Sequence, residues 1–202
     1  MIFEQINKSG LEFLNSLGQN EIISFISVIF ADYPILFLPL FLVSMWIYYT
    51  YKNQNINKNN LLFIFYCSFL AIIINLIIQK FIHMERPEEY LKAAGNLLMS
   101  HVPDASFPSD HAAVSVSFLT GLFLFNYKKV GYFFSIFVLL MLISRIIVGV
   151  HWPFDIIVGS IIGVLSAFII KKLIDIKTIK NINNTIIKYE PYGQIYNFIT
   201  KK

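Results

Sequence analysis

The sequence predicts an all-α fold, a polytopic membrane helical bundle of about five transmembrane helices that follow an amphipathic N-terminal helix. Of the 202 residues, 56% are hydrophobic and only 14% are charged, whereas soluble domains contain about 25% charged residues. Five apolar runs are close to the roughly 17–25 residues that cross a bilayer as a helix. These runs leave too little polar surface for a soluble protein, so we expect a single membrane domain over residues 1–202.

The first segment, Met1–Asn20, predicts an amphipathic helix. Its apolar residues recur at helical spacing with polar residues between them, and they are Ile2, Phe3, Ile6, Phe13, Leu14 and Leu17. A helix of this kind lies in the plane of the membrane interface. Glu4 and Glu12 interrupt the segment, so it lacks the continuous apolar core of a cleavable signal peptide.

The next segment, Glu21–Asp32, is apolar and ends at Asp32, two residues before Pro34. Proline bends or ends a helix because it lacks an N–H donor. Two interpretations stay open from the sequence. The segment is either re-entrant or the start of a long, kinked first span.

Five runs form the predicted transmembrane core over residues 33–170. They are Tyr33–Tyr51, Leu61–His83, His111–Asn126, Val130–Val150 and Pro153–Ile170. A basic tail, residues 171–202, follows them. Lysines gather in three connections that a five-span layout places on one side: Lys52, Lys58, Lys128, Lys129, Lys171, Lys172, Lys177 and Lys180. The positive-inside rule makes that side cytoplasmic, so the loop Met84–Asp110 and the turn at His151–Trp152 face outward. The net charge of +4 comes mainly from these lysines, which favours membrane orientation over nucleic-acid binding.

The two arginines of the chain, Arg86 and Arg145, each lie at the predicted outer end of a span. A guanidinium near lipid is costly and indicates function. Its planar fork matches the oxygens of a phosphate. Snorkelling of the side chain to the interface is the alternative for each arginine, although the chain uses lysine at every other boundary.

Two histidines lie in informative local patterns. Pro108 favours a helix start, so Ser109 and His111 fall at a helix N-terminus, which attracts anions. His151 precedes Asp155 by four residues across a second predicted helix start at Pro153. An aspartate on one ring nitrogen leaves the other nitrogen able to attack. A capping turn and a structural hydrogen bond are the simpler alternatives for these two patterns.

The combination of these groups on one outer face predicts a phosphate site. Gly149 permits close approach of the backbone beside His151. Two arginines and a helix N-terminus neutralise a phosphoryl group, while one histidine attacks and another protonates the leaving group. A metal site is the competing use of His and Asp side chains. It fits less well because the arginines would repel a cation, so we expect neither a metal nor another cofactor.

The residues from Ser144 to Asp155 match the S-R-x3-G-x-H-x3-D motif of the type 2 phosphatidic acid phosphatase (PAP2) superfamily, which the chain resembles. Pro108–His111 matches its P-S-x-H motif, and Arg86-Pro87 matches the end of its K-x6-R-P motif. The stretch from Asp104 to His111 is also similar to that of BcrC-type undecaprenyl-pyrophosphate phosphatases. The resemblance to these enzymes covers most of the chain.

The resemblance implies residue roles. It makes His151 the nucleophile that forms a phosphohistidine, Asp155 the residue that orients it, and His111 the general acid. The implied phosphate-binding residues are Arg86, Ser109 and Arg145, with Lys80 and Asp110 as further candidates. Lys80 departs from the motif because its lysine position falls on Gln79, and Asp110 replaces the usual glycine. Roles for His83 and His101 are not assigned.

The implied activity is hydrolysis of undecaprenyl diphosphate at the outer side of the bacterial inner membrane, as part of lipid-carrier recycling for cell-wall synthesis and bacitracin resistance. The implied partners are a lipid phosphate and the bilayer, without nucleic acid. The same motifs fit phosphatases of phosphatidate, phosphatidylglycerol phosphate or a lipid A phosphate, and a phosphotransferase. A non-catalytic lipid-phosphate binder or transporter is the alternative from another class.

Overall fold

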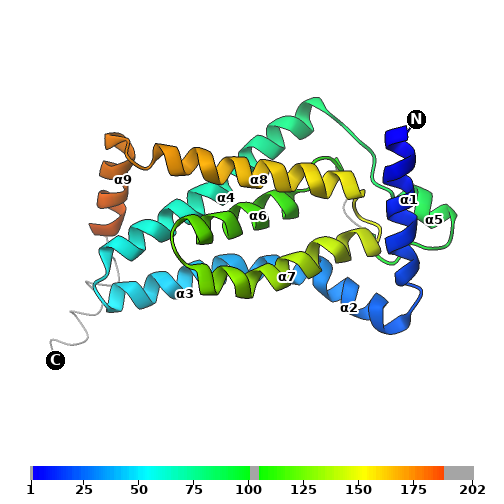
Figure 1. Cartoon of the computed structure of the whole chain (residues 1–202), viewed down its shortest axis with the longest axis horizontal. Helices are drawn as coiled ribbons and strands as arrows, with labels where there is room; N and C mark the ends of the chain where they lie inside the picture. The colour runs from blue at the N-terminus through cyan, green and yellow to red at the C-terminus, as the bar shows by residue number, and fades with distance from the viewer. Residues whose placement is uncertain (1, 101–104, 189–202) are drawn as a thin grey trace.

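The computed structural model describes residues 2–100 and 105–188, and in these ranges the chain is helical without a strand. Its helices run mainly along one direction, while α1 (Ile2–Leu17) and α9 (Lys177–Lys188) lie across opposite ends of the bundle (Figure 1). The remaining helices are α2 (Glu21–Asp32), α3 (Phe37–Tyr51), α4 (Asn55–Phe81), α5 (Glu88–Ala93), α6 (Asp110–Leu124), α7 (Lys128–Ile147) and α8 (Pro153–Leu173). This architecture confirms the predicted all-α membrane bundle.

The first span is long and kinked, which decides between the two interpretations of Glu21–Asp32. Helix α2, a 3-10 turn at Tyr33–Leu36 and helix α3 form one apolar run of 31 residues. Asn20 begins the run, since its side chain accepts hydrogen bonds from two backbone N–H groups of the first turn. Pro34 lies at the start of the 3-10 turn, where its missing N–H costs little. The predicted start of this span at Tyr33 is therefore wrong, because the span begins at Glu21 and includes helix α2.

Three further helices, α4, α7 and α8, are long and apolar enough to cross a membrane. The predicted third span corresponds to α6, which has only 15 residues and ends before Asn126, a residue with a left-handed φ of 66°. At about 1.5 Å per residue, a helix of this length is shorter than the hydrocarbon core. Its burial between α4 and α8 explains why a short helix suffices here.

Helices α6 and α8 pack closely because two glycines of α8 face the backbone of α6. A Cβ at Gly159 would lie 2.5 Å from the carbonyl oxygen of Ser109, and one at Gly163 would lie 2.6 Å from that of Ala113. Side chains at these positions would force the helices apart. The contact holds the N-termini of α6 and α8 together at the end of the bundle where α1 lies (Figure 1).

Helix α1 covers this end with a face that contains Leu11 and Asn15. Leu11 and Asn15 are buried, and the Asn15 side-chain amide donates to the carbonyl oxygen of Ile147 at 2.8 Å. The exposed face instead presents Ile2, Ile6 and Phe13. The predicted amphipathic helix is confirmed, and its exposed apolar face is the one that we expect to enter the membrane interface.

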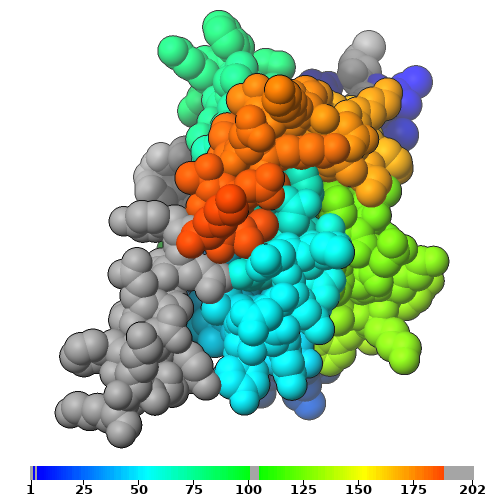
Figure 2. All heavy atoms as spheres, turned by 90° about the vertical axis from the view of Figure 1, so that its left-hand side faces the viewer, coloured from blue at the N-terminus to red at the C-terminus, as the bar shows by residue number. Residues whose placement is uncertain are grey.

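The opposite end contains the lysine-bearing connections. Figure 2 shows this end, with the α3–α4 turn beside α9. Asn183 of α9 joins them, because it accepts a hydrogen bond from Tyr66 at 2.8 Å and donates one to Asn59 at 2.7 Å. The lysines that the sequence predicts on one side therefore lie at the end away from α1.

Candidate active site

A cluster of polar side chains, several of them buried, lies at the α1 end, where α7 ends and where α6 and α8 begin. Its members come from segments far apart in the sequence. Those predicted from the sequence are Arg86, Ser109, Asp110, His111, Arg145, His151 and Asp155, and the structure brings all of them to this end of the bundle.

Gly149 positions His151. Helix α7 ends at Ile147, and Gly149 adopts a left-handed φ of 87° that reverses the chain. A hydrogen bond from the N–H of Val150 to the carbonyl of Arg145 closes the turn at 3.1 Å. A Cβ at Gly149 would also lie 2.4 Å from Leu91 Cδ1, so the expected close approach is present. His151, only 2% exposed, therefore faces back toward the last turn of α7.

The two ring nitrogens of His151 face groups of opposite charge. Nδ1 lies 3.4 Å from Asp155 Oδ2, whereas Nε2 lies 3.3 Å from Nη2 of Arg145 and 3.5 Å from Nη1 of Arg86. A proton on Nδ1, held by the carboxylate, leaves a lone pair on Nε2 between the two guanidiniums. The arrangement suits attack by Nε2 on a phosphorus atom bound by the arginines.

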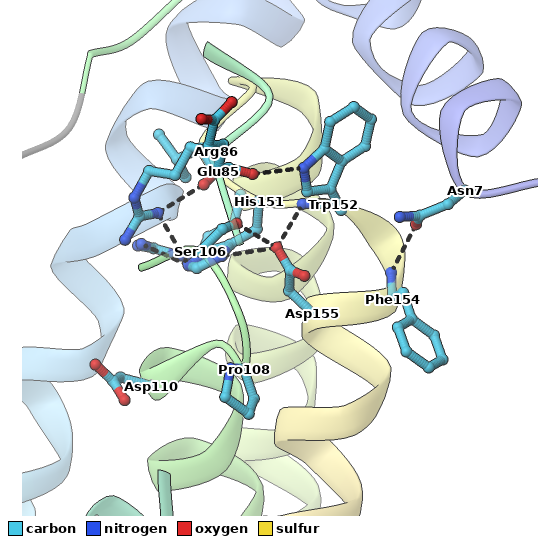
Figure 3. A network of polar contacts seen from close by, with 12 residues as sticks. Asn7, Glu85, Arg86, Ser106, Pro108, Asp110, His151, Trp152, Phe154 and Asp155 are labelled. Atoms are coloured by element: carbon cyan, nitrogen blue, oxygen red, sulfur yellow. Dashed lines mark hydrogen bonds and ion pairs between the residues drawn. The ribbon is translucent and has the colours of Figure 1, made fainter. Parts of the chain in front are cut away.

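Three donors hold the Asp155 carboxylate in place (Figure 3). Its Oδ2 atom accepts a hydrogen bond from the backbone N–H of Trp152 at 2.9 Å and a short one from the hydroxyl of Ser106, in addition to facing His151. Asp155 also lies in the first turn of α8, where the helix dipole favours a negative charge. Ser106 is fully buried, and sequence reasoning missed it because no spacing rule links it to Asp155.

The two arginines are fixed by backbone carbonyls. Arg86 donates to the carbonyl of Val150 at 2.6 Å. Arg145, 1% exposed, donates through Nη1 to the carbonyl of Ala31 at 2.9 Å and pairs with Asp32. The Nε atom of Arg145 is buried and has no hydrogen-bond partner among the described residues. An unpaired buried donor is costly, and a phosphate oxygen is the acceptor that would satisfy it.

The N-terminus of α6 contributes a second unpaired group. Ser109 is the N-cap residue and fully buried, yet its hydroxyl has no partner in the part of the chain that the structure describes. His111 follows in the first turn, with Nε2 3.4 Å from Oδ1 of Asp32. Ser109 and the helix N-terminus suit a phosphate oxygen, and His111 lies beside them.

The motif position of the family lysine is occupied by Gln79, not Lys80. Gln79 donates to Asp110 Oδ1 at 3.1 Å, and Asn75 donates to the same oxygen at 2.6 Å. Lys80, one residue further along α4, is exposed. The structure thus does not bring Lys80 to the phosphate site, because a step of one residue turns a helical side chain by about 100°. Among the described residues, Asp110 is hydrogen-bonded to neutral amides and not to a cation.

Sequence reasoning also missed Asp32 and Asn75. The sequence did indicate Asp32, since a single carboxylate ends an otherwise apolar segment, whereas nothing in the sequence pairs Asn75 with Asp110.

His83 is exposed, and His101 lies outside the described residues. No group of three or more His, Cys, Asp or Glu side chains with metal-site geometry occurs within 2–100 and 105–188. Metal independence stays a prediction.

Comparison with known proteins agrees with this architecture. The model of the PAP2 superfamily matches residues 60–179. The Bacitracin transport permease protein BcrC of Bacillus licheniformis is 32% identical over 179 residues, 84% of this chain and 81% of that protein. The Undecaprenyl-diphosphatase BcrC of Bacillus subtilis (strain 168) is 26% identical over 183 residues, 91% of this chain and 89% of that protein.

A solved structure shares the fold. The crystal structure of the first transmembrane PAP2 type phosphatidylglycerolphosphate phosphatase from Bacillus subtilis superposes with a TM-score of 0.59 at 21% identity. The match covers 85% of this chain and 86% of that one. The family match, the extent of the sequence similarity and the apolar helices lead to one conclusion: this multi-pass membrane protein belongs to the PAP2 superfamily.

Proposed function

We propose that the protein hydrolyses undecaprenyl diphosphate to undecaprenyl phosphate and inorganic phosphate, without a metal, at the outer side of the bacterial inner membrane. The observation that supports this most directly is the placement of His151, whose Nδ1 faces Asp155 and whose Nε2 faces Arg86 and Arg145. The name of the Bacillus subtilis relative, Undecaprenyl-diphosphatase BcrC, supports the choice of substrate.

In the first step, Nε2 of His151 attacks the terminal phosphorus of the diphosphate. The P–N bond forms as the bond from that phosphorus to the bridging oxygen breaks. Undecaprenyl phosphate leaves with the electron pair, and His111 gives a proton to the departing oxygen. Arg145, Arg86 and Ser109 would hold the equatorial oxygens, where charge is stabilised in the transition state.

In the second step, water hydrolyses the phosphohistidine. His111, now neutral, takes a proton from the water as its oxygen attacks phosphorus. The P–N bond breaks, the electron pair returns to Nε2, and inorganic phosphate leaves. Asp155 stabilises the charge that the His151 ring carries while it is phosphorylated.

An apolar cavity of about 180 Å³ supports a lipid as the substrate. It lies between the start of α3 and the middle of α7, with Pro34, Phe137 and Met141 among its lining residues. Pro34 follows Asp32 by two residues, and Met141 precedes Arg145 by one helical turn. The cavity therefore begins next to the Asp32–Arg145 pair, on the side of the pair toward the middle of the membrane. The first isoprene units of a lipid held by its diphosphate would lie there.

The distribution of the lysines supports the proposed orientation of the site. The lysine-bearing connections lie at the opposite end of the bundle, and the positive-inside rule places them in the cytoplasm. The proposed active site then opens toward the extracytoplasmic side.

We also propose that residues 1–202 form one functional domain, with α1 in the outer interface.

Transport is the second candidate, because the relative from Bacillus licheniformis is named a bacitracin transport permease. A binding protein or a permease needs phosphate donors but no nucleophile with an orienting carboxylate. His151, Asp155 and His111 are all present here. Their arrangement favours the enzyme.

The decisive experiment is a substrate panel with purified protein in detergent. Undecaprenyl diphosphate, phosphatidate, phosphatidylglycerol phosphate and a lipid A phosphate are offered in parallel, with and without a chelator, and phosphate release is measured. We expect the highest kcat/KM for undecaprenyl diphosphate and no effect of the chelator.

The matched variants are His151→Ala and His83→Ala, since His83 is an exposed histidine. We expect loss of turnover only for His151→Ala. Full activity of His151→Ala would refute the assigned nucleophile, and absence of turnover on every lipid would favour the transport candidate.

A further inference from the structure

Asp32, the last residue of α2, connects two groups of the proposed site. Its Oδ1 atom pairs with Nη1 of Arg145 and lies 3.4 Å from Nε2 of His111. Helix α2 otherwise consists mainly of apolar residues, since its sequence is EIISFISVIFAD. An ionisable side chain within a membrane span is costly and therefore indicates a specific partner.

We propose that Asp32 is a positioning residue that fixes the guanidinium of Arg145 for phosphate binding and transition-state stabilisation. This inference rests on the proposed function. It assigns a role to the first span, which none of the three family motifs includes.

The hydrogen bonds of Arg145 support this role. Nη1 donates both to the carbonyl of Ala31 at 2.9 Å and to the carboxylate of Asp32, so two consecutive residues of α2 hold one nitrogen. The two remaining nitrogens, Nη2 and Nε, lie on the other edge of the guanidinium. Nη2 is 3.3 Å from Nε2 of His151, and Nε is buried without an acceptor among the described residues. This edge offers two parallel donors, as bidentate phosphate recognition requires, directly beside the nucleophile.

The charge of Asp32 suits this function better than a neutral acceptor would. Arg145 is 1% exposed, and a buried guanidinium without a counter-charge is strongly disfavoured. Arg86 and the carboxylate of Asp110 also act electrostatically on Arg145. Asp110 is bonded to the amides of α4 and Asp155 faces His151, so Asp32 is the carboxylate in direct contact with Arg145.

The contact with His111 extends the role of Asp32 to the general acid. The Oδ1 atom of Asp32 contacts both the guanidinium of Arg145 on α7 and the imidazole of His111 on α6. It therefore sets the separation between the group that binds the phosphoryl oxygens and the group that protonates the leaving oxygen. A misplacement of about 1 Å at such a position lowers rates on the order of 100-fold.

The test compares Asp32→Ala and Asp32→Asn with the matched control Glu21→Gln, which changes an exposed carboxylate at the other end of the same helix. Turnover of undecaprenyl diphosphate and inhibition by inorganic phosphate are measured. For Asp32→Ala we expect kcat to fall about 100-fold, as for the loss of one transition-state donor. We expect KM to rise by a smaller factor and phosphate inhibition to weaken. Asp32→Asn keeps an oxygen acceptor for Nη1, so we expect it to recover part of kcat, and Glu21→Gln to match the wild type.

The outcomes separate this inference from the proposed function. His151→Ala is measured in the same assay. If it is inactive while Asp32→Ala and Asp32→Asn both turn over within twofold of the wild type, the proposed function stands and the role of Asp32 is wrong. If either Asp32 variant binds inorganic phosphate more tightly, the carboxylate competes with phosphate, and the positioning role is likewise overturned. If Asp32→Ala does not fold, as judged by thermal unfolding in detergent, the near-isosteric Asp32→Asn decides: it must lose kcat while folding normally.

Discussion

His151 Nε2 lies 3.3 Å from Nη2 of Arg145, which precedes it by six positions, and helix α7 ends between the two residues. The reversal at Gly149 creates this contact. One local turn thus brings the proposed nucleophile beside a proposed phosphate-binding group, whose guanidinium is also held by Ala31 and Asp32 of α2. This contact depends on the left-handed conformation of Gly149.

Gly149→Ala should therefore lower activity sharply. The substitution places a Cβ 2.4 Å from Leu91 Cδ1 and forces an L-residue to a φ of 87°, which costs on the order of 1 kcal/mol in strain alone. We expect kcat/KM to fall at least tenfold, with a lower temperature of unfolding.

The matched control for this substitution is Gly95→Ala. Gly95 has a φ of 72°, but no atom lies within 4 Å of the added Cβ. Gly95→Ala should show the backbone strain without the clash and should retain activity. Equal losses in the two variants would show that the close approach at Gly149 is unimportant.

Asp155→Asn tests the orientation of His151. The amide cannot hold a proton on Nδ1 as a carboxylate does, so the ring favours the wrong tautomer. In a comparable His–Asp pair this change lowers kcat on the order of 10⁴-fold. Ser106→Ala removes one donor to Oδ2 but keeps the donor from Trp152 and the charge. We expect a smaller loss, about tenfold, because a hydrogen bond to a charged group contributes about 1.5–3 kcal/mol. An Asp155→Asn enzyme as active as Ser106→Ala would contradict the orienting role.

Much of this site could be predicted because its members lie in short motifs. The helix start at Pro153, the helix start two residues after Pro108, and the spacing of His151 to Asp155 follow from local chemistry. The contacts of Asp32 and Asn75 could not be predicted, since they depend on which helices become neighbours. Asp32 meets Arg145 across 113 residues of sequence, and Asn75 meets Asp110 across 35. The end of α6 was placed two residues too late, at Asn126 instead of Leu124, for a related reason: an apolar run does not reveal where the helix ends within it.

Gln79 and Asp110 replace the lysine and glycine of the family motifs, and their hydrogen bond predicts that the two substitutions are coupled. Gln79→Lys should retain most activity, because the lysine would pair with the carboxylate. Asp110→Gly should lower activity, because it removes the acceptor of both α4 amides. In the double variant the two effects should not add. We expect a coupling free energy of about 0.5–3 kcal/mol from kcat/KM values, as for residues in contact.

The control is Lys80→Gln, which changes an exposed residue and should change kcat/KM less than twofold. Strict additivity of Gln79→Lys and Asp110→Gly would show that the two residues act independently.

Filling the cavity beneath Arg145 should distinguish lipid chains by length. Val138 lines this cavity and is 4% exposed, whereas Leu139, the next residue of α7, is 60% exposed. Val138→Phe should place a ring where the first isoprene units lie, while Leu139→Phe only adds apolar surface toward the membrane. We expect Val138→Phe to raise KM for undecaprenyl diphosphate at least tenfold, which corresponds to about 1.4 kcal/mol of lost binding. Inorganic phosphate, which has no lipid chain, should inhibit both variants as strongly as it inhibits the wild type. If Val138→Phe and Leu139→Phe alter KM equally, the lipid chain does not enter this cavity and must leave the site between other helices.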